Sequence, residues 1–339
     1  MFFALTDDQR EFGTAVTTYL AERFDLEAVR GVVEDAAASG ADGAVGDGNP
    51  EALWKAAAEQ GWLAVTVPEE HDGLGLGLVE AQVIARSLGA GVAPGPWRGT
   101  VLAADAVRLA GSPEQQAAWL PRLASGEAVG AVSLSGAPVE YAAIADVLVV
   151  RDGDGLALAE RGGFTTEAVG SYDGTTRLAR VTVETSEAFP GEAIADLTAR
   201  ATVLVASDLA GVAREAITRT VAYDREREQF GVPVGSFQAI KHALADLHVG
   251  VTMAEHAVLY AAHAVDTGAD GADLAVAVAK AKASDAALAA TAAMIQYHGG
   301  IGYTWEHEAH LFYKRAKRLA GQYGDADAQR ERIATLTIG

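Results

Sequence analysis

Two short stretches of the chain contain the residue types best suited to binding a phosphate group. The first includes Arg227, whose guanidinium matches the geometry of paired phosphate oxygens. The second includes Gly299 and Gly300, where the lack of side chains lets backbone N–H groups approach an anion. Each feature alone also has an ordinary explanation, a charge at a helix end for Arg227 and a turn for the glycines. Together the two stretches favour a ligand-binding site.

The composition argues against several other kinds of site. The chain has no cysteine, so disulfides, Cys-ligated zinc and thiol nucleophiles are excluded. We expect no metal site, because His242, His298, His307 and His310 form no metal-like pair with a supporting carboxylate. The net charge of −20, without a long basic run, argues against nucleic-acid binding.

The start of the chain and its apolar runs bear on localisation. The first ten residues, MFFALTDDQR, lack the charged start and long apolar run of a signal peptide. No apolar stretch approaches the roughly 20 residues that cross a bilayer. We therefore expect a cytoplasmic protein that does not bind a membrane.

The residues that follow Arg227 predict a long helix in a bundle. Gly231, Pro233 and Gly235 break the chain, and apolar residues then recur at spacings of three and four, a heptad pattern. These residues are Phe237, Ile240, Leu244, Leu247, Val251, Ala254, Val258, Ala261 and Val265. Further helices are expected at 198–227, 272–297 and 306–320, which completes a four-helix bundle.

The first part of the chain predicts a helical domain. Thr6 and Gln9 have the spacing of a capping box, and Asn49–Pro50 has the signature of a helix start. Residues 34–48 have no period and are expected to form a mobile loop. The other helices are expected at 78–88, at 100–110, and from the capping sequence Ser112–Gln115 to about residue 124.

The period changes after residue 127. Strands are expected at 128–135, 147–151, 156–159 and 178–184, separated by Gly/Asp turns. A chain of 339 residues has room for two domains and a small third one. We predict a mainly α protein: an α-helical domain at 1–127, a short β domain at 128–192, and a four-helix bundle at 193–339.

Several strings in this order resemble the acyl-CoA dehydrogenase family. In the bundle they are Arg-x-Gln-Phe-Gly from Arg227, Phe-Gln-Ala-Ile-Lys-His from Phe237, and Gln-Tyr-His-Gly-Gly-Ile-Gly-Tyr from Gln296, followed by Glu306 and Arg315. In the first part they are VPEE-x-x-GLG and GSPEQ-x-x-x-WLP-x-LASGE. The resemblance covers both helical regions and implies the fold of that family.

The resemblance also implies a cofactor and a reaction. In the family, FAD lies between subunits, and a carboxylate removes the α-proton of an acyl thioester while the β-hydride moves to the flavin. The two bundle stretches face the adenosine and pyrophosphate half of FAD. The implied cofactor-binding residues are Arg227, Gln229, Phe230, Gln238, Gln296, Gly299 and Gly300. Arg227 would pair with the pyrophosphate, Phe230 would pack on the adenine or ribose, and the amides would reach the ribose or adenine edges.

The flavin-ring side of the site departs from the family. Family members carry Glu-Pro and Gly-Ser-Asp strings and a Trp-containing strand in the β domain. This chain reads AVSLSG at 131–136 instead, and has no Trp between Trp119 and Trp305. Its β domain is also shorter than the family's.

The catalytic Glu of the family is missing as well. Tyr323 or Gly324 occupies one position that the family uses for it, and Ala201, or a neighbour of it, occupies the other. Asp325 lies in a turn, where a local hydrogen bond is its expected role. We expect Glu306 and Glu308 to pair with Arg315 or Lys317 rather than to act as a base. No residue of the chain is predicted to be catalytic.

This pattern resembles the base-lacking subunit of bacterial heterotetrameric acyl-CoA dehydrogenases, some of which act on steroid side-chain thioesters. The implied partners are a homologous subunit in an α2β2 assembly, an acyl-CoA substrate, and an electron-transfer flavoprotein or similar acceptor. Three alternatives stay open: a homomeric flavoenzyme with Asp325 or a shifted Glu as base, a non-catalytic scaffold, and a flavin oxidase or monooxygenase of the same fold.

Overall fold

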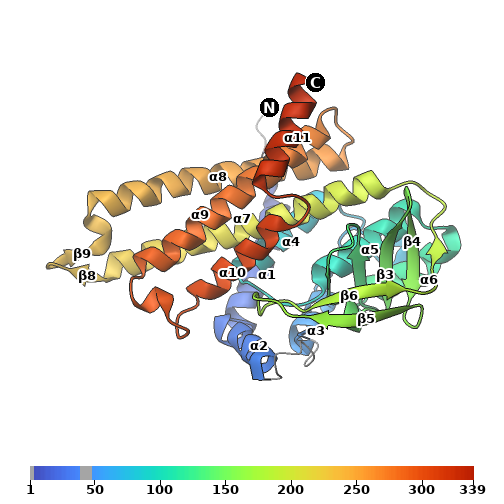
Figure 1. Cartoon of the computed structure of the whole chain (residues 1–339), viewed down its shortest axis with the longest axis horizontal. Helices are drawn as coiled ribbons and strands as arrows, with labels where there is room; N and C mark the ends of the chain where they lie inside the picture. The colour runs from blue at the N-terminus through green and yellow to red at the C-terminus, as the bar shows by residue number, and fades with distance from the viewer. Residues whose placement is uncertain (1–3, 39–47) are drawn as a thin grey trace. The chain divides into compact units, whose positions relative to one another are not determined.

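A computed structural model describes the backbone of residues 4–38 and 48–339, and the side chains of all these except 35–38. The chain divides into two compact units, each made of separate segments (Figure 1). The bundle unit consists of Met1–Leu26, Gln82–Ala93 and Thr202–Gly339. The sheet unit consists of Glu27–Ala81 and Pro94–Ala201.

The bundle unit is built from long helices. They are α1 (Asp7–Arg23), α4 (Leu78–Ala90) from Gln82 on, α7 (Ile194–Glu226) from Thr202 on, α8 (Gln238–Asp266), α9 (Ala272–Tyr297), α10 (Ala309–Gly321) and α11 (Ala326–Ile338). A hairpin of β8 (Glu228–Gln229) and β9 (Val232–Pro233) and the turn η3 (Val234–Ser236) connect α7 to α8, and η4 (Ile301–Tyr303) lies between α9 and α10.

Glycines bring two of these helices into backbone contact. A Cβ at Gly211 of α7 would lie 1.9 Å from the carbonyl oxygen of Arg86 on α4, and a Cβ at Gly89 of α4 would lie 2.2 Å from that of Asp208 on α7. No side chain fits at either position, so the crossing of α4 and α7 depends on both glycines.

The predicted heptad seam of α8 is confirmed over its central turns. Leu244, Val251, Ala254, Val258 and Ala261 are buried, and α8 packs along the alanine-rich face of α9. The first turn departs from the pattern, since Phe237 is 36% exposed within this chain.

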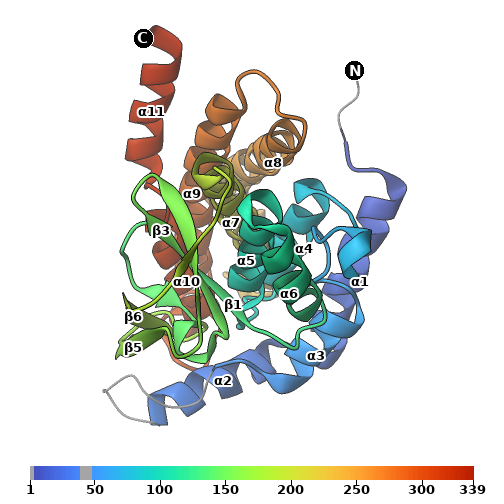
Figure 2. The ribbon, with the colours of Figure 1, turned by 90° about the vertical axis from the view of Figure 1, so that its right-hand side faces the viewer.

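The sheet unit combines helices with two small sheets (Figure 2). Its helices are α2 (Leu26–Ala38), α3 (Glu51–Glu59), α5 (Trp97–Ala110) and α6 (Pro113–Ala124), with the short turns η1 (Glu69–His71) and η2 (Ala142–Ile144). Its strands are β1 (Gly130–Ser133), β2 (Val139–Glu140), β3 (Val147–Asp152), β4 (Gly155–Glu160), β5 (Phe164–Val169), β6 (Leu178–Val183) and β7 (Glu187–Ala188).

The strand order is β1-β3-β4-β7 in one sheet and β2-β6-β5 in the other. β1 runs parallel to β3, while β3 and β4 form an antiparallel hairpin through the turn at Asp152–Gly155. α5 packs against β1, and Ala131, Leu148 and Ala159 lie in the core between the strands.

The predicted fold class and most long elements are confirmed, with several corrections at their ends. The loop expected at 34–48 is wrong at its start, because α2 continues to Ala38, and residues 39–47 lie outside the described part. Pro50 is the N-cap of α3 rather than its first residue, since the helix begins at Glu51. α10 begins at Ala309, three residues later than expected. The three-domain division stays a prediction.

A buried ion pair connects three segments of the bundle unit. Arg315 on α10 donates from Nε and Nη2 to the two carboxylate oxygens of Asp208 on α7, at 2.9 and 2.7 Å. Its Nη1 donates to the carbonyl oxygen of Ala93, at 3.0 Å. The expectation that Glu308 pairs with Arg315 is wrong, because Arg315 makes its buried bidentate contact with Asp208 and Glu308 pairs with Arg219.

Replacing Arg315 by Met should destabilise the chain by about 3–5 kcal/mol, because the buried Asp208 carboxylate would lose its bidentate ion pair. Urea unfolding followed by circular dichroism measures this difference. Lys317→Met, an exposed change on the same helix, is the matched control and should alter the free energy of unfolding by less than about 0.5 kcal/mol. A loss as small as that of the control for Arg315→Met would contradict the structural role of the pair.

Candidate functional site

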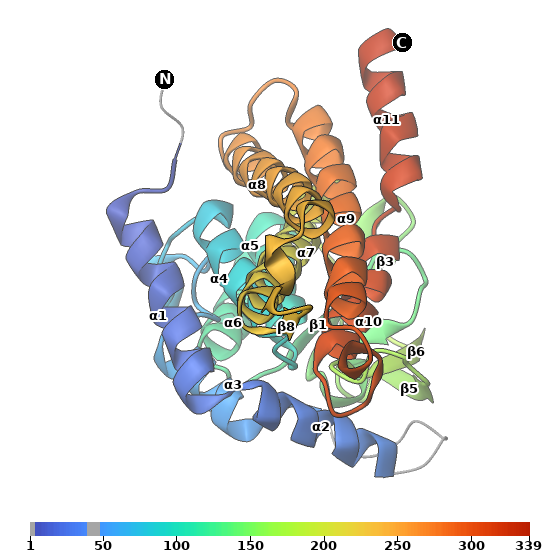
Figure 3. The same ribbon diagram turned by 90° about the vertical axis from the view of Figure 1, so that its left-hand side faces the viewer.

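All seven residues predicted to bind the cofactor lie at one end of the bundle unit. Arg227 follows α7, Gln229 and Phe230 lie in the hairpin, and Gln238 begins α8. Gln296 and the two glycines lie at the end of α9. Figures 1 and 3 show the hairpin and the α9–α10 connection at the same end of these helices.

A stack of rings joins the two predicted stretches. The ring of Tyr223 on α7 lies 4.4 Å from that of His298, with 27° between their planes, and His298 lies 4.4 Å from His307. Burial lowers the pKa of His298, so its ring is neutral and Nδ1–H donates to the carbonyl oxygen of Met294, at 2.7 Å. The end of α7 is therefore fixed to the residues just before Gly299.

An ion pair also connects α7 to the start of α10. Arg219 on α7 donates to Glu308, the N-cap of α10, at 3.0 Å. Glu308 had been expected to pair with Arg315 or Lys317. That expectation is wrong, because Glu308 lies within reach of Arg219 while Arg315 is held by Asp208.

The hairpin turn presents an aromatic ring to solvent. Phe230 and Gly231 have positive φ angles of 54° and 77°, and Gln229 pairs with Val232 across the turn. A bulky residue at positive φ is strained by an amount on the order of 1–3 kcal/mol, a cost commonly found at functional sites. Phe230 is 94% exposed and forms a T-shaped pair with Phe237, at 6.4 Å between ring centroids. Phe230 is thus not a core residue, the alternative that its sequence allowed.

The groups that a dinucleotide phosphate requires are accessible in this region. The Arg227 guanidinium is exposed and has no hydrogen-bond or ion-pair partner within the described residues. Gly299 has a φ of +65°, and no atom lies within 4 Å of a Cβ built on it or on Gly300. Gln238 and Gln296 are exposed. A free guanidinium and open glycine backbone fit an anionic nucleotide.

The α10–α11 turn contains Tyr323 and Gly324, the residues predicted from the sequence to stand where the family has its catalytic Glu. Tyr323 and Gly324 have positive φ angles of 53° and 88°, and neither carries a carboxylate. Asp325 is the N-cap of α11, with Oδ1 accepting from the backbone N–H of Ala328 at 2.9 Å. Its carboxylate thus makes the local hydrogen bond expected from the sequence. At the other position for the base, Ala201 is buried and offers no ionisable group.

A fully buried lysine, which the sequence analysis missed, holds this turn. Lys280 on α9 donates its three ammonium hydrogens to Ser284 Oγ at 3.1 Å and to the carbonyl oxygens of Ala320 and Gly324 at 2.9 Å each. Burial lowers the pKa of Lys280 to about 8, and the Asp325 carboxylate opposes this shift. The sequence signal that could have indicated this role was the presence of a lysine on the alanine-rich face of α9.

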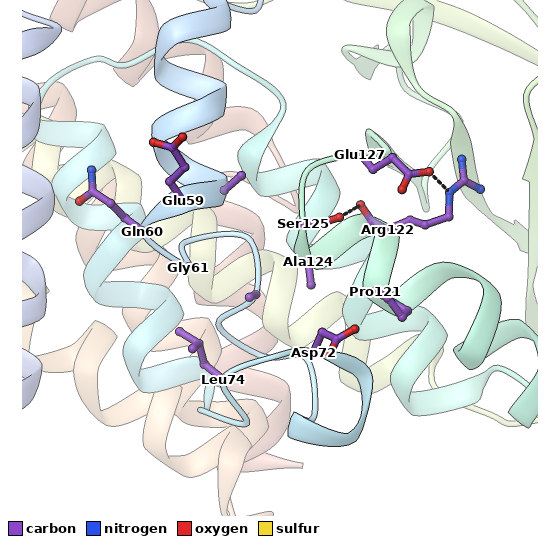
Figure 4. A pocket seen from close by; sticks show the side chains of 12 residues that line it. Glu59, Gln60, Gly61, Asp72, Leu74, Pro121, Arg122, Ala124, Ser125 and Glu127 are labelled. Atoms are coloured by element: carbon purple, nitrogen blue, oxygen red, sulfur yellow. Dashed lines mark hydrogen bonds and ion pairs between the residues drawn. The ribbon is translucent and has the colours of Figure 1, made fainter.

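The sheet unit contains a separate surface groove of about 560 Å³ (Figure 4). It lies between the end of α3, the residues around Leu74, and α6. Its one arginine, Arg122, is paired with Glu127 at 2.8 Å. Such an open groove with an internally paired charge indicates no particular ligand.

Two absences bear on other functions. The described residues contain no group of three His, Cys, Asp or Glu side chains placed to hold a metal ion. None of the helices in the described ranges is long and apolar enough to span a membrane.

Comparison with known proteins decides the family. A model of the acyl-CoA dehydrogenase N-terminal domain matches residues 6–127, and one of the acyl-CoA dehydrogenase C-terminal domain matches residues 193–336. Acyl-CoA dehydrogenase IpdE2 of Mycobacterium tuberculosis is 40% identical over 272 residues, covering 79% of this chain and 81% of that protein. The chain belongs to the acyl-CoA dehydrogenase family. The acyl-CoA dehydrogenases are oxidoreductases, and the predicted family and enzyme class are confirmed.

Two solved structures of acyl-CoA dehydrogenase type share the fold over almost the whole chain. The ChsE4–ChsE5 complex from Mycobacterium tuberculosis has a TM-score of 0.88 at 25% identity, covering 99% of this chain and 98% of the matched one. A variant of the Tcur3481–Tcur3483 steroid acyl-CoA dehydrogenase has a TM-score of 0.86 at 26% identity, covering 98% of both chains. The predicted likeness to the steroid-type members of the family is therefore confirmed.

Lys280 should make the stability of the chain depend on alkaline pH. The folded protein releases the Lys280 proton near pH 8, whereas the unfolded chain keeps it to about pH 10.5. Because the unfolded state binds more protons in this window, the free energy of unfolding should rise between pH 8 and 10.5, by on the order of 1–3 kcal/mol. Urea unfolding at pH 7.5 and pH 10 measures the rise.

Lys280→Met should lack this rise, and Lys282→Met, an exposed change two residues away, should keep it. Other lysines and tyrosines titrate in the same way in both variants, so their contribution to the free energy of unfolding cancels when the two pH profiles are compared. Parallel pH profiles for the wild type and Lys280→Met would contradict the assignment.

Proposed function

We propose that this chain is the base-lacking subunit of a heteromeric, FAD-dependent acyl-CoA dehydrogenase. The assembled enzyme removes hydrogen from the α and β carbons of an acyl-CoA thioester. This chain contributes one end of its bundle unit to the adenosine and pyrophosphate half of the FAD site. A homologous partner subunit, in an α2β2 assembly, supplies the rest of the site and the catalytic Glu.

The observation that carries the proposal is the contrast between the two parts of the site. The nucleotide end has an exposed, unpaired Arg227, an outward Phe230 and open backbone at Gly299 and Gly300. The place of the base has only Tyr323 and Gly324, next to an aspartate that caps a helix. A chain that has the nucleotide-binding residues but no catalytic carboxylate can take part in the reaction only together with a chain that has the carboxylate.

Each residue has a role in binding rather than in proton transfer. When bound, FAD supplies the hydride acceptor of the reaction. Arg227 would hold the pyrophosphate through charge-assisted hydrogen bonds, and the backbone N–H groups near Gly299 and Gly300 would donate to its oxygens. Phe230 would cover the adenine or ribose, while the amides of Gln229, Gln238 and Gln296 would hydrogen-bond to their edges. A carboxylate of the partner subunit would accept the α-proton.

The relatives support a substrate class for the proposal. One structural neighbour is described as a steroid acyl-CoA dehydrogenase, and another is a complex of two chains, ChsE4 and ChsE5. We extend both properties to this chain and propose a steroid side-chain CoA thioester as substrate. An electron-transfer flavoprotein or a similar acceptor would be the electron-accepting partner of the assembled enzyme.

Arg227→Ala should weaken FAD binding to the assembled enzyme by about 10- to 100-fold, the expected effect of losing a charge-assisted pair. The test is co-expression with the homologous partner, then measurement of the mass of the complex and of its FAD-to-protein ratio. Arg225→Ala removes an exposed cation two residues earlier and is the matched control; it should leave the ratio unchanged.

Two results would contradict the proposal. Normal flavin content in the Arg227→Ala complex would favour a scaffold role for the chain. A yellow protein, purified without a partner, that reduces an electron acceptor with an acyl-CoA would indicate a homomeric enzyme.

A further inference from the structure

Asp224 is a buried carboxylate without a partner inside the proposed nucleotide site. It is 1% exposed, and neither side-chain oxygen has a hydrogen-bond partner within the described residues. The η3 turn lies over it: a Cβ built on Gly235 would be 3.0 Å from the Asp224 carbonyl oxygen and 3.4 Å from its Cβ. Buried polar groups are nearly always paired in native proteins, so an unpaired carboxylate calls for a functional explanation.

The surroundings of Asp224 disfavour its charge. Burial raises the pKa of Asp224 to about 6. It also lies in the last turn of α7, where the helix carbonyls present the negative end of the dipole. The charged or titratable groups on neighbouring elements are Arg225, Glu226, Arg227, Glu228, Lys241, His242 and His298. In the described part of the chain, none of them forms an ion pair with Asp224, and the buried His298 ring is neutral.

Asp224 lies next to the residue proposed to hold the pyrophosphate. The backbone N–H of Arg227 donates to the carbonyl oxygen of Tyr223 at 2.8 Å, so the helical geometry continues to Arg227. Residues three apart on a helix are neighbours, with Cβ atoms about 5–6 Å apart. Asp224 and Arg227 nevertheless do not pair, since the carboxylate lies under η3 and the guanidinium points to solvent. The Arg227 guanidinium is therefore available to a ligand, and a buried carboxylate lies three residues before it in the chain.

Building on the function proposed above, we propose that Asp224 couples nucleotide binding to proton uptake. Its carboxylate opposes the binding of the FAD pyrophosphate at Arg227, and a larger fraction of the molecules hold a proton from solvent on this carboxylate when the pyrophosphate dianion binds. A dianion close to a carboxylate stabilises its protonated form, and by reciprocity the protonated form binds the dianion more tightly. The uptake of the proton changes no covalent bond of the cofactor.

The first test measures FAD affinity of the complex, co-expressed with the homologous partner, between pH 5.5 and 8. The wild-type complex should bind FAD about 5- to 10-fold more tightly at the lower pH. Asp224→Asn should bind equally well across the range and as tightly as the wild type does at pH 5.5. Glu226→Gln and Glu228→Gln remove exposed carboxylates nearby and should keep the wild-type profile, because solvent screens their charges.

The second test counts protons directly. Titration calorimetry with FAD, in two buffers of different ionisation enthalpy at pH 7, should detect uptake of a fraction of a proton by the wild-type complex. The Asp224→Asn complex should take up none. Equal uptake by both complexes, or the same pH profile of affinity for both, would overturn the inference.

A third measurement needs no FAD. The folded-state pKa of Asp224, about 6, is higher than the ordinary aspartate value of 3.8, so its contribution to stability is fully present below pH 3.8 and is lost as pH rises to about 6. Asp224→Asn in the full chain should therefore melt above the wild type at pH 7.5, with a gap that narrows at pH 5 and closes only below pH 3.8. The same melts verify that the variant folds; Asp224→Ser is the alternative if it does not. A gap independent of pH would also overturn the inference.

The two proposals fail separately. If Arg227→Ala lowers FAD content but Asp224→Asn behaves as the wild type, the nucleotide site stands and the proton coupling does not. If Arg227→Ala has no effect on FAD content, the nucleotide site itself is wrong.

Discussion

The bundle unit depends on one guanidinium. Arg315 binds both carboxylate oxygens of Asp208 and the carbonyl oxygen of Ala93, so it joins α10 to α7 and to the residues after α4. These contacts are buried, and such pairs are sensitive to geometry because a displaced partner leaves a desolvated charge. With α7 and α10 held in this way, the stack of Tyr223, His298 and His307 can join the two stretches that carry the nucleotide-binding residues.

Two ends of this unit use charge in opposite ways. At the α10–α11 turn, the buried ammonium of Lys280 has all three hydrogens satisfied, and it fixes the backbone of the turn. At the other end Arg227 is exposed and Asp224 is buried, and the side chain of neither has a hydrogen-bond or ion-pair partner in the part of the chain that the structure describes. Satisfied charges stabilise a structure, whereas unsatisfied ones store free energy that a ligand can release. The distribution supports binding at the hairpin and a purely structural role for the turn.

Regular patterns in the sequence predicted much of the fold. The capping boxes at Thr6 and Ser112 and the buried positions of α8 follow from local spacing, which is why their helices were placed correctly. α11 was missed because it buries only Gln329 and so has no apolar stripe, and the two-residue strands are too short to show a period. The site residues came from family strings. The contacts of Arg315, Lys280 and Asp224 could not be predicted, since each depends on elements distant in sequence or on burial that spacing does not encode.

The glycine contact between α4 and α7 has a consequence for how the bundle tolerates change. Because Gly89 faces the backbone at Asp208 and Gly211 faces the backbone at Arg86, the two helices meet at one register only. A slip of one residue along either helix would drive a side chain into the opposite main chain. The two glycines therefore fix the register of α4 against α7. Insertions or deletions in α4 or in the first half of α7 should be far rarer among viable variants than substitutions of side chains.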